Sequence, residues 1–369
     1  VAYGVARAAI LDDRRALVWA GIAAGIALQA KYTLPLWLLC LAAAVALFPE
    51  RRILRMRELW LGLGLAAVIA APSIVWQATH GLPFRELVRA AADKDIAYGP
   101  LAYAVNQVLL LDPLFAPIWL AGLAAPFVVR DLRAVRFLPV AFAFAAVAIV
   151  AEHGKDYYLA PAYPPLFALG GILLERAVRN GVVRTGYLAV AAASAFVLAP
   201  LALPILPPAT LVAYQRAIHL APAAQEHGDD GDVIPPTFAD MLGWHDFVRQ
   251  IGTAYVALPP AERANTGILG DNYGEAAALD VYGAPYGLPP ALSGHNQYAY
   301  WGARGQDPAN ILRVQLHPER LRPHCRRTTV VGTTQSLYAR DFENGRAIAF
   351  CEGLHPRYAA LEADLRDIR

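Results

Sequence analysis

Residues 152–171 read EHGKDYYLAPAYPPLFALGG. This stretch begins as a short charged and aromatic turn and continues as an uncharged apolar segment marked by prolines. A helix that only crosses a bilayer does not need a lysine and two tyrosines at its end, but a site for a lipid-linked phosphate does. We therefore predict a phosphate site at Lys155, Tyr157 and Tyr158. The alternative is an interfacial anchor, in which the same side chains only lie at headgroup depth.

The composition of the chain predicts a membrane protein. Hydrophobic residues make up 57% of the 369 residues and charged residues 17%, which is far from an ordinary soluble domain. The net charge of +2 gives no indication of nucleic-acid binding. The chain starts with Val1 and shows no signal peptide, so we expect that it is a fragment without its N-terminal part.

Apolar segments in the first 206 residues predict about seven membrane-spanning helices, because a spanning helix needs roughly 17 to 25 apolar residues. Within the fourth segment, Asp112 and Pro113 predict a break between an interfacial or re-entrant helix and a span. The seven segments are Ala16–Ala30, Tyr32–Pro49, Leu59–Ala78, Leu101–Val129, Phe137–Ala151, Tyr157–Leu174 and Thr185–Leu206.

The loops between these segments alternate in basic charge. One set carries twelve arginines, from Arg14 to Arg184, and the other carries five basic residues, among them Lys31 and Lys155. Because arginine-rich loops stay in the cytoplasm, the second set faces outward. After seven crossings, residues 207–369 also lie outside.

Residues 207–369 predict a small extracytoplasmic α/β domain that follows a linker rich in proline and aspartate. Helices and strands alternate in it: we expect helices over Trp244–Ala257 and Tyr273–Tyr282, and strands over Thr266–Asp271, Thr328–Thr333 and Ala347–Cys351. An oxidising compartment would permit a disulfide between Cys325 and Cys351, which could equally be free thiols. If bonded, their Cα atoms lie within about 7 Å.

Two further groups of polar residues are candidates for the phosphate or the sugar. Lys31 stands at an outer helix end, where it is either a second phosphate ligand or a snorkelling anchor. His80 lies in WQATHGLPF (residues 76–84), where it is either a sugar ligand or a hydrogen-bonded loop residue.

In the exterior domain, Asn272 and Glu275 begin a predicted helix, where they either bind an anion or sugar hydroxyl or cap the helix. His295 and Asn296 lie in SGHNQYAYWG (residues 293–302). Polar residues among aromatic ones suit a carbohydrate surface, and they suit a packed loop equally well.

Four segments resemble bacterial members of glycosyltransferase family 39, which includes the protein mannosyltransferase and lipid A aminoarabinose transferase relatives with a GT-C fold. They are QAKYTLPLW (29–37), APSIVWQATHGLPF (71–84), GKDYYLAPAYPPLFALGG (154–171) and DNYGEAAALDVYGAPYGLPPALSGHNQYAYWG (271–302). The resemblance covers nearly the whole chain, and the last two segments are the most specific. Gln77 stands where the family usually has Asn.

The resemblance implies an integral membrane enzyme that moves a sugar from a polyprenyl-phosphate donor to an acceptor on the outer side of the bacterial cytoplasmic membrane. It places Lys155, Tyr157 and Tyr158 near the lipid phosphate, with Lys31 as a further candidate. The catalytic acidic residues of the family are expected upstream of Val1, so no catalytic residue is expected in this chain. The acceptor is a lipid, a glycan or a protein, and a divalent metal ion is a possible cofactor.

Two other functions fit the same composition. A multi-pass transporter or flippase would carry ionisable residues within its spans, and only Asp112 comes near such a position. The second of these functions is a non-catalytic membrane scaffold with an exterior binding domain. The sequence contains no Walker loop, dinucleotide fingerprint, HExxH or CxxC spacing, or nucleophile elbow. The residues do not identify the donor sugar, the acceptor or the oligomeric state.

Overall fold

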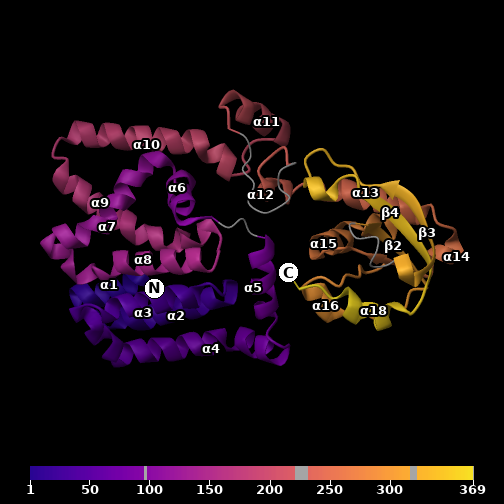
Figure 1. Cartoon of the computed structure of the whole chain (residues 1–369), viewed down its shortest axis with the longest axis horizontal. Coiled ribbons are helices and arrows are strands. Elements are labelled where there is room, and N and C mark those ends of the chain that lie inside the picture. Colours follow the sequence, from indigo (N-terminus) through magenta and orange to yellow (C-terminus); the bar gives the residue numbers. More distant parts are fainter. Residues whose placement is uncertain (95–97, 221–231, 316–321, 369) are drawn as a thin grey trace. The chain divides into compact units, whose positions relative to one another are not determined.

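The computed structural model describes residues 1–94, 98–220, 232–315 and 322–368. The chain divides into two compact units (Figure 1). The first contains Val1–Phe84 and Asp95–Ala202, and the second contains Arg85–Lys94 and Leu203–Arg369. The main boundary falls at residues 202 and 203, a few residues before the one predicted.

The first unit is helical. Its elements are α1 (Ala2–Leu11), α2 (Arg15–Ala30), α3 (Leu34–Ala46), η1 (Pro49–Arg55), α4 (Arg57–Thr79), α6 (Pro100–Leu110), η2 (Pro113–Phe115), α7 (Ala116–Val128), η3 (Arg130–Val135), α8 (Phe137–Ala151), η4 (Asp156–Ala162), α9 (Tyr163–Ala177) and α10 (Gly181–Ala202). Every predicted apolar segment is helical, and α1 is an additional apolar helix.

Among the described residues, three helices are long and apolar enough to cross a membrane: α4, the continuous helical stretch Asp156–Ala177, and α10. The α6–α7 pair would be a fourth span if it is counted as one, and it bends by 94° at its break. That bend coincides with Asp112 and Pro113, where the sequence predicts a break. Helices α1, α2, α3 and α8 are apolar but have only 10 to 17 residues, so by length the described structure supports fewer spans than the predicted seven.

Glycines allow two helix pairs in this unit to pack backbone against backbone. A Cβ atom on Gly21 of α2 would overlap the backbone of Gly62 in α4, and one on Gly170 of α9 would overlap the Ile118 carbonyl in α7. Such contacts between small residues are the usual way in which helices pack in a bilayer, where van der Waals contact replaces the hydrophobic effect.

The second unit contains a mixed four-stranded sheet. The strand order is β1 (Thr266–Leu269), β2 (Asn310–Gln315), β4 (Ala347–Leu354) and β3 (Cys325–Thr333). β1 pairs with β2 in parallel, and β4 pairs with both β2 and β3 antiparallel. The other elements are α5 (Pro83–Lys94), α11 (Pro208–Ala217), α12 (Pro236–Ala239), α13 (Trp244–Val256), α14 (Pro260–Arg263), α15 (Tyr273–Tyr282), η5 (Ala284–Tyr286), α16 (Gln297–Trp301), η6 (Arg322–His324), η7 (Asp341–Glu343) and α18 (Tyr358–Leu365).

Buried side chains alternate between the two faces of this sheet. Leu312 and Phe350 belong to a core shared with α13 and α15, whereas Ile311 and Cys351 belong to a second core with α18. The predicted α/β layer is therefore present. β2 was not predicted, because its sequence NILRVQ places Arg313 inside the unit. Helices α5 and α11 were also missed, the second of them inside the predicted linker.

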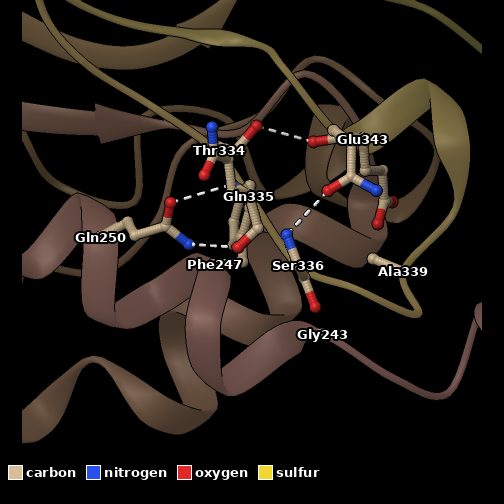
Figure 2. Close-up of a pocket in the computed structure, with 9 residues that line it drawn as sticks. Gly243, Phe247, Gln250, Thr334, Gln335, Ser336, Ala339 and Glu343 are labelled. Carbon is tan, nitrogen blue, oxygen red and sulfur yellow. Dashed lines mark hydrogen bonds between the residues drawn. The ribbon is translucent and has the colours of Figure 1, made fainter. Parts of the chain in front are cut away.

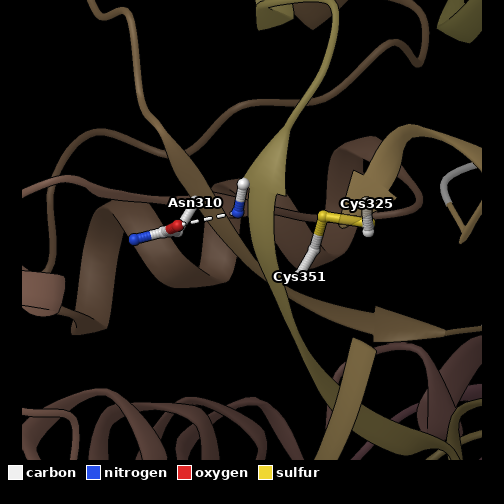
Figure 3. Close-up of a disulfide and its surroundings, with 4 residues drawn as sticks. Asn310, Cys325 and Cys351 are labelled. Carbon is white, nitrogen blue, oxygen red and sulfur yellow. Dashed lines mark hydrogen bonds between the residues drawn. A yellow bond between two sulfur atoms is a disulfide. The ribbon is translucent and has the colours of Figure 1, made fainter. Parts of the chain in front are cut away.

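Cys325 and Cys351 form a disulfide between the paired strands β3 and β4 (Figure 3). Their Cα atoms are 5.4 Å apart, within the predicted limit. The Asn310 side chain beside the bond accepts a hydrogen bond from the Gly353 N–H at 3.0 Å, which joins β2 to the end of β4. Cys40 is a buried free thiol.

Candidate functional site

The turn at residues 152–158 is built by the end of α8. His153 adopts a left-handed conformation with φ 53°, and the Gly154 N–H donates to the Ile149 carbonyl at 2.8 Å. This six-to-one bond is typical of a Schellman helix end, which turns the chain sharply. The chain is then extended at Lys155 and enters η4, where the Asp156 carboxylate accepts from the Tyr157 N–H at 2.7 Å. The local sequence thus sets the direction in which the chain leaves α8 towards Lys155.

Lys31 from another loop lies against this turn. Its Nζ atom is 4.9 Å from the ring centroid of Tyr157 and 4.6 Å from that of Tyr158. The two rings contact each other edge to face, with centroids 5.0 Å apart. Cation–π attraction to two rings holds the ammonium group in place. We call Lys31, Lys155, Tyr157 and Tyr158 the two-lysine cluster.

The two lysines are close enough for their charges to interact. Burial, and then the charge of Lys155, lower the pKa of the Lys31 ammonium group. The whole sequence contains three lysines, at positions 31, 94 and 155, so two of the three belong to this cluster. Like charges repel, and an anion placed between them would relieve the repulsion. This arrangement joins all four residues that the sequence predicted for the lipid phosphate.

The end of α2 is held against α4, which sets the position of Lys31. The Gln29 side chain donates to the Ile69 carbonyl at 2.6 Å, and the Tyr32 hydroxyl hydrogen bonds with Ser73. The Tyr32 ring also contacts Phe84, with ring centroids 4.9 Å apart. Lys31 follows the last residue of α2, so its charge also complements the carbonyl end of that helix.

His80 lies at the C-terminal end of α4 and is exposed. Its Nδ1 atom is 2.8 Å from the Trp76 carbonyl oxygen, and its ring stacks on the Trp76 ring with centroids 4.4 Å apart. These contacts match the hydrogen-bonded loop residue that was one of the two interpretations of His80.

The other candidates lie in the second unit, where they make contacts inside the fold. The Asn272 side chain accepts from the Glu275 N–H at 2.9 Å and caps α15. Glu275 is buried and accepts from the Asp271 N–H at 2.7 Å. His295 is buried and its Nδ1 accepts from the Tyr273 N–H at 3.1 Å. The helix-cap interpretation of Asn272 therefore describes its geometry.

Asn296 differs from these three residues in its backbone. It is half-buried, adopts a positive φ of 49° and donates its N–H to the Asp367 carbonyl at 2.9 Å. This bond ties the loop after His295 to the C-terminal segment, as a packed loop requires.

Glu275 and Glu343 are buried acids with raised pKa values. Burial, and then the charge of Asp271, raise the pKa of Glu275 to about 8. Burial, and then the charge of Asp240, raise the pKa of Glu343 to about 7. Both shifts have the same physical cause, because a low-dielectric interior disfavours the charged carboxylate. Arg313 forms a buried ion pair with Asp271 at 2.5 Å.

A small pocket next to Glu343 is lined by α13 and by the segment 334–344 (Figure 2). Its free space is about 10 Å³, enough for about one water molecule. The Gln250 side chain makes two hydrogen bonds of 2.9 Å with the backbone of Gln335, and the Ser336 N–H donates to Asn344 at 2.8 Å (Figure 2). The pocket is too small for a sugar.

A larger cavity of about 330 Å³ lies in the first unit between α1, α2, α3, η1 and α4. Apolar side chains line it, and on α2 they are Leu17, Ala20, Gly21 and Ala24. Such a lining suits hydrocarbon and offers nothing to a free sugar.

No group of three or more His, Cys, Asp or Glu side chains that could hold a metal ion occurs among the described residues. Comparison with known proteins gives no matching family model, no matching curated protein and no matching solved structure. The function proposed below is therefore inferred from the residues and the geometry of this chain.

Proposed function

We propose that the protein is an integral membrane glycosyltransferase that uses a polyprenyl-phosphate sugar donor. The observation that supports this function is the position of the Lys31 ammonium group against the rings of Tyr157 and Tyr158, where the charge of Lys155 also acts on it. Two ammonium groups and two phenol hydroxyls are suited to a phosphate, since each can donate a hydrogen bond to a phosphate oxygen. An interfacial anchor needs neither the second lysine nor the contact between the two loops.

The reaction would take place outside the cytoplasmic membrane of a bacterium. Three described helices are long enough to cross a membrane, and the basic loops predict that the two-lysine cluster and residues 207–369 face outward. The disulfide between Cys325 and Cys351 agrees with an oxidising compartment.

The chemistry is a displacement at the anomeric carbon. The acceptor hydroxyl oxygen forms a bond to this carbon, the bond from the carbon to the phosphate oxygen breaks, and the polyprenyl phosphate leaves with the electron pair. A base takes the hydroxyl proton. Lys31 and Lys155 would stabilise the negative charge that develops on the leaving phosphate. The resemblance to glycosyltransferase family 39 implies that this base is a carboxylate.

Binding of a short-chain polyprenyl phosphate to the 369-residue chain in nanodiscs tests the proposal. Lys155→Ala removes a charge-assisted hydrogen bond from a half-buried position, which costs about 1.5 to 3 kcal/mol, or roughly 10- to 150-fold in Kd. Tyr157→Phe loses one neutral hydroxyl and weakens binding less. Arg89→Ala, which removes an exposed cation from α5, is the matched control and leaves Kd unchanged. Equal affinities for Lys155→Ala and wild type would contradict the proposal.

A transporter or flippase is the second candidate, because one observation favours it. Asp112 is buried at the α6–α7 break, and its Oδ2 atom has no hydrogen-bond partner within the described part of the chain. Buried carboxylates at broken helices are typical of ion and substrate pathways. A flippase would exchange a fluorescent polyprenyl phosphate between the leaflets of proteoliposomes, and Asp112→Asn would slow this exchange. Exchange no faster than in empty liposomes rules out the flippase.

A further inference from the structure

Three buried polar side chains lie behind the turn that carries Lys155. Gln107 and Tyr103, from α6, and Tyr163, from the start of α9, are 2% to 4% exposed. The Gln107 Nε2 atom donates to the Asp156 carbonyl at 3.0 Å, and the Tyr103 hydroxyl donates to the same oxygen at 3.4 Å. The Tyr163 hydroxyl donates to Gln107 Oε1 at 2.8 Å. We call Tyr103, Gln107 and Tyr163 the Gln107 cluster.

The hydrogen bonds of this cluster have one consistent direction. The Asp156 carbonyl can only accept, so it requires the amide nitrogen of Gln107. The amide oxygen then faces Tyr163, whose hydroxyl supplies the proton. Tyr163 thereby fixes the orientation of Gln107, and Gln107 fixes the Asp156 carbonyl. A chain of bonds in a buried environment holds its geometry more tightly than the same bonds in water do.

We infer that Gln107 is a positioning residue for the two-lysine cluster. This inference rests on the proposed function, because it concerns how the same phosphate would be bound. The Asp156 carbonyl is joined directly to the segment that carries Tyr157 and Tyr158, and Lys155 precedes it. Holding this one oxygen therefore sets where Lys155 projects and where the two rings meet Lys31.

The need for such a residue follows from η4. Tyr158 N–H donates to the Lys155 carbonyl at 3.1 Å, so η4 starts as a 3₁₀ turn. Pro161 lies inside η4 and lacks an N–H group. Short 3₁₀ helices have weak hydrogen-bond geometry, and a contact from another helix gives this turn the rigidity it lacks on its own. Gln107, 49 residues away in sequence, supplies that contact.

The double variant Gln107→Leu with Tyr163→Phe tests the inference in the full chain. Leu has a similar volume to Gln, and the Tyr163→Phe change removes the hydroxyl that would otherwise stay buried without a partner. Folding is therefore preserved better than in Gln107→Leu alone. Leu138→Ala creates a cavity in a different core cluster of the same unit and is the control for a general loss of stability. Lys155→Ala is the reference for loss of the phosphate ligand.

Two measurements are made on each variant. The first is the Kd for a short-chain polyprenyl phosphate. It rises about fivefold in the double variant, because the hydrogen bond from Gln107 to the Asp156 carbonyl, which stabilises the turn by about 1 kcal/mol, is lost. The second is the rate at which an amine-reactive reagent labels Lys31 and Lys155, followed by mass spectrometry with Lys94 as internal reference. The labelling rate at Lys31 at least doubles once the rings of Tyr157 and Tyr158 move away. Leu138→Ala lowers Tm without either effect.

The outcomes separate this inference from the proposed function. If the double variant matches the wild type in Kd and in labelling, Gln107 is a structural residue and the inference is wrong, whereas the effect of Lys155→Ala still supports the phosphate site. If the wild type does not bind the polyprenyl phosphate, the proposed function fails. The labelling rates then still decide whether Gln107 positions the turn.

Discussion

The stability of the second unit should fall as the pH rises from 6 to 8, because Glu275 is buried as a neutral acid. Its pKa in the folded chain is about 8, raised from the ordinary value of 4.5 by burial and then by the charge of Asp271. The folded chain therefore holds a proton that the unfolded chain releases between these two pH values. Since the folded state binds more protons, each pH unit inside this window lowers the free energy of unfolding.

The size of the effect follows from the shift. One pH unit well inside the window corresponds to about 1.36 kcal/mol. Because Glu275 is half ionised at its pKa of about 8, the range from pH 6 to pH 8 corresponds to about 2.3 kcal/mol, or roughly fiftyfold in the unfolding equilibrium. Glu343, with a pKa of about 7, acts in the same direction over the lower half of this range. Glu275→Gln keeps an oxygen that can accept from the Asp271 N–H but cannot ionise. This variant should lose most of the dependence between pH 7 and 8.

Hydrogen–deuterium exchange of peptides from β1 and α15 in the full chain measures this effect, after correction for the intrinsic exchange rate at each pH. The wild type should lose between two and three orders of magnitude in protection from pH 6 to pH 8, because the roughly tenfold effect of Glu343 multiplies the roughly fiftyfold effect of Glu275. Glu343→Gln is the matched variant and should retain the loss above pH 7. Protection in the wild type that stays constant or rises with pH would refute the reasoning, since Glu275 would then be ionised in the folded chain.

Three other predictions concern the second unit and the topology. Replacing Cys325 and Cys351 by Ala opens a loop with a sequence separation of 26. The free energy of unfolding should fall by about 3.5 kcal/mol, measured with denaturant, and an unchanged unfolding midpoint would contradict this prediction. Arg313→Met leaves Asp271 buried without its cation and should lower the free energy of unfolding by about 3 to 5 kcal/mol. Adding Asp271→Asn to this variant should restore part of the loss, and full stability of Arg313→Met alone would show that the ion pair is dispensable. A topology reporter fused after Arg57 should report the cytoplasm and one at the C-terminal end the outside, and a cytoplasmic signal at the C-terminal end would contradict the predicted orientation.

Local sequence signals predicted several elements accurately. The helix predicted over Tyr273–Tyr282 is α15 with the same bounds, because Asn272 caps its start and Gly283 follows its end. The predicted break in the fourth apolar segment is confirmed by the 94° bend, since Pro113 cannot continue the hydrogen bonding of α6. These signals act over a few residues, so a single sequence contains them in full.

Elements that depend on distant contacts were missed. Strand β2 carries Arg313, which a sequence pattern assigns to the surface, but its partner Asp271 lies 42 residues earlier and makes burial possible. Gln107 was not singled out for the same reason: a lone glutamine in an apolar segment gives no sign that a carbonyl 49 residues away will need its amide.

The sequence by itself determined that the chain is largely helical and apolar in its first 202 residues and α/β beyond them, because hydrophobic periodicity and composition are properties of neighbouring residues. It also predicted Lys31 and Lys155 as candidates for one phosphate site. Only the tertiary structure decided how Lys31 packs against the rings of Tyr157 and Tyr158, which follow Lys155. Lys31 and Lys155 are 124 positions apart in the chain, and this packing depends on the end of α2 being held to α4 and on the turn after α8 being held by α6. Packing between helices, which no local pattern specifies, brings the two charges together.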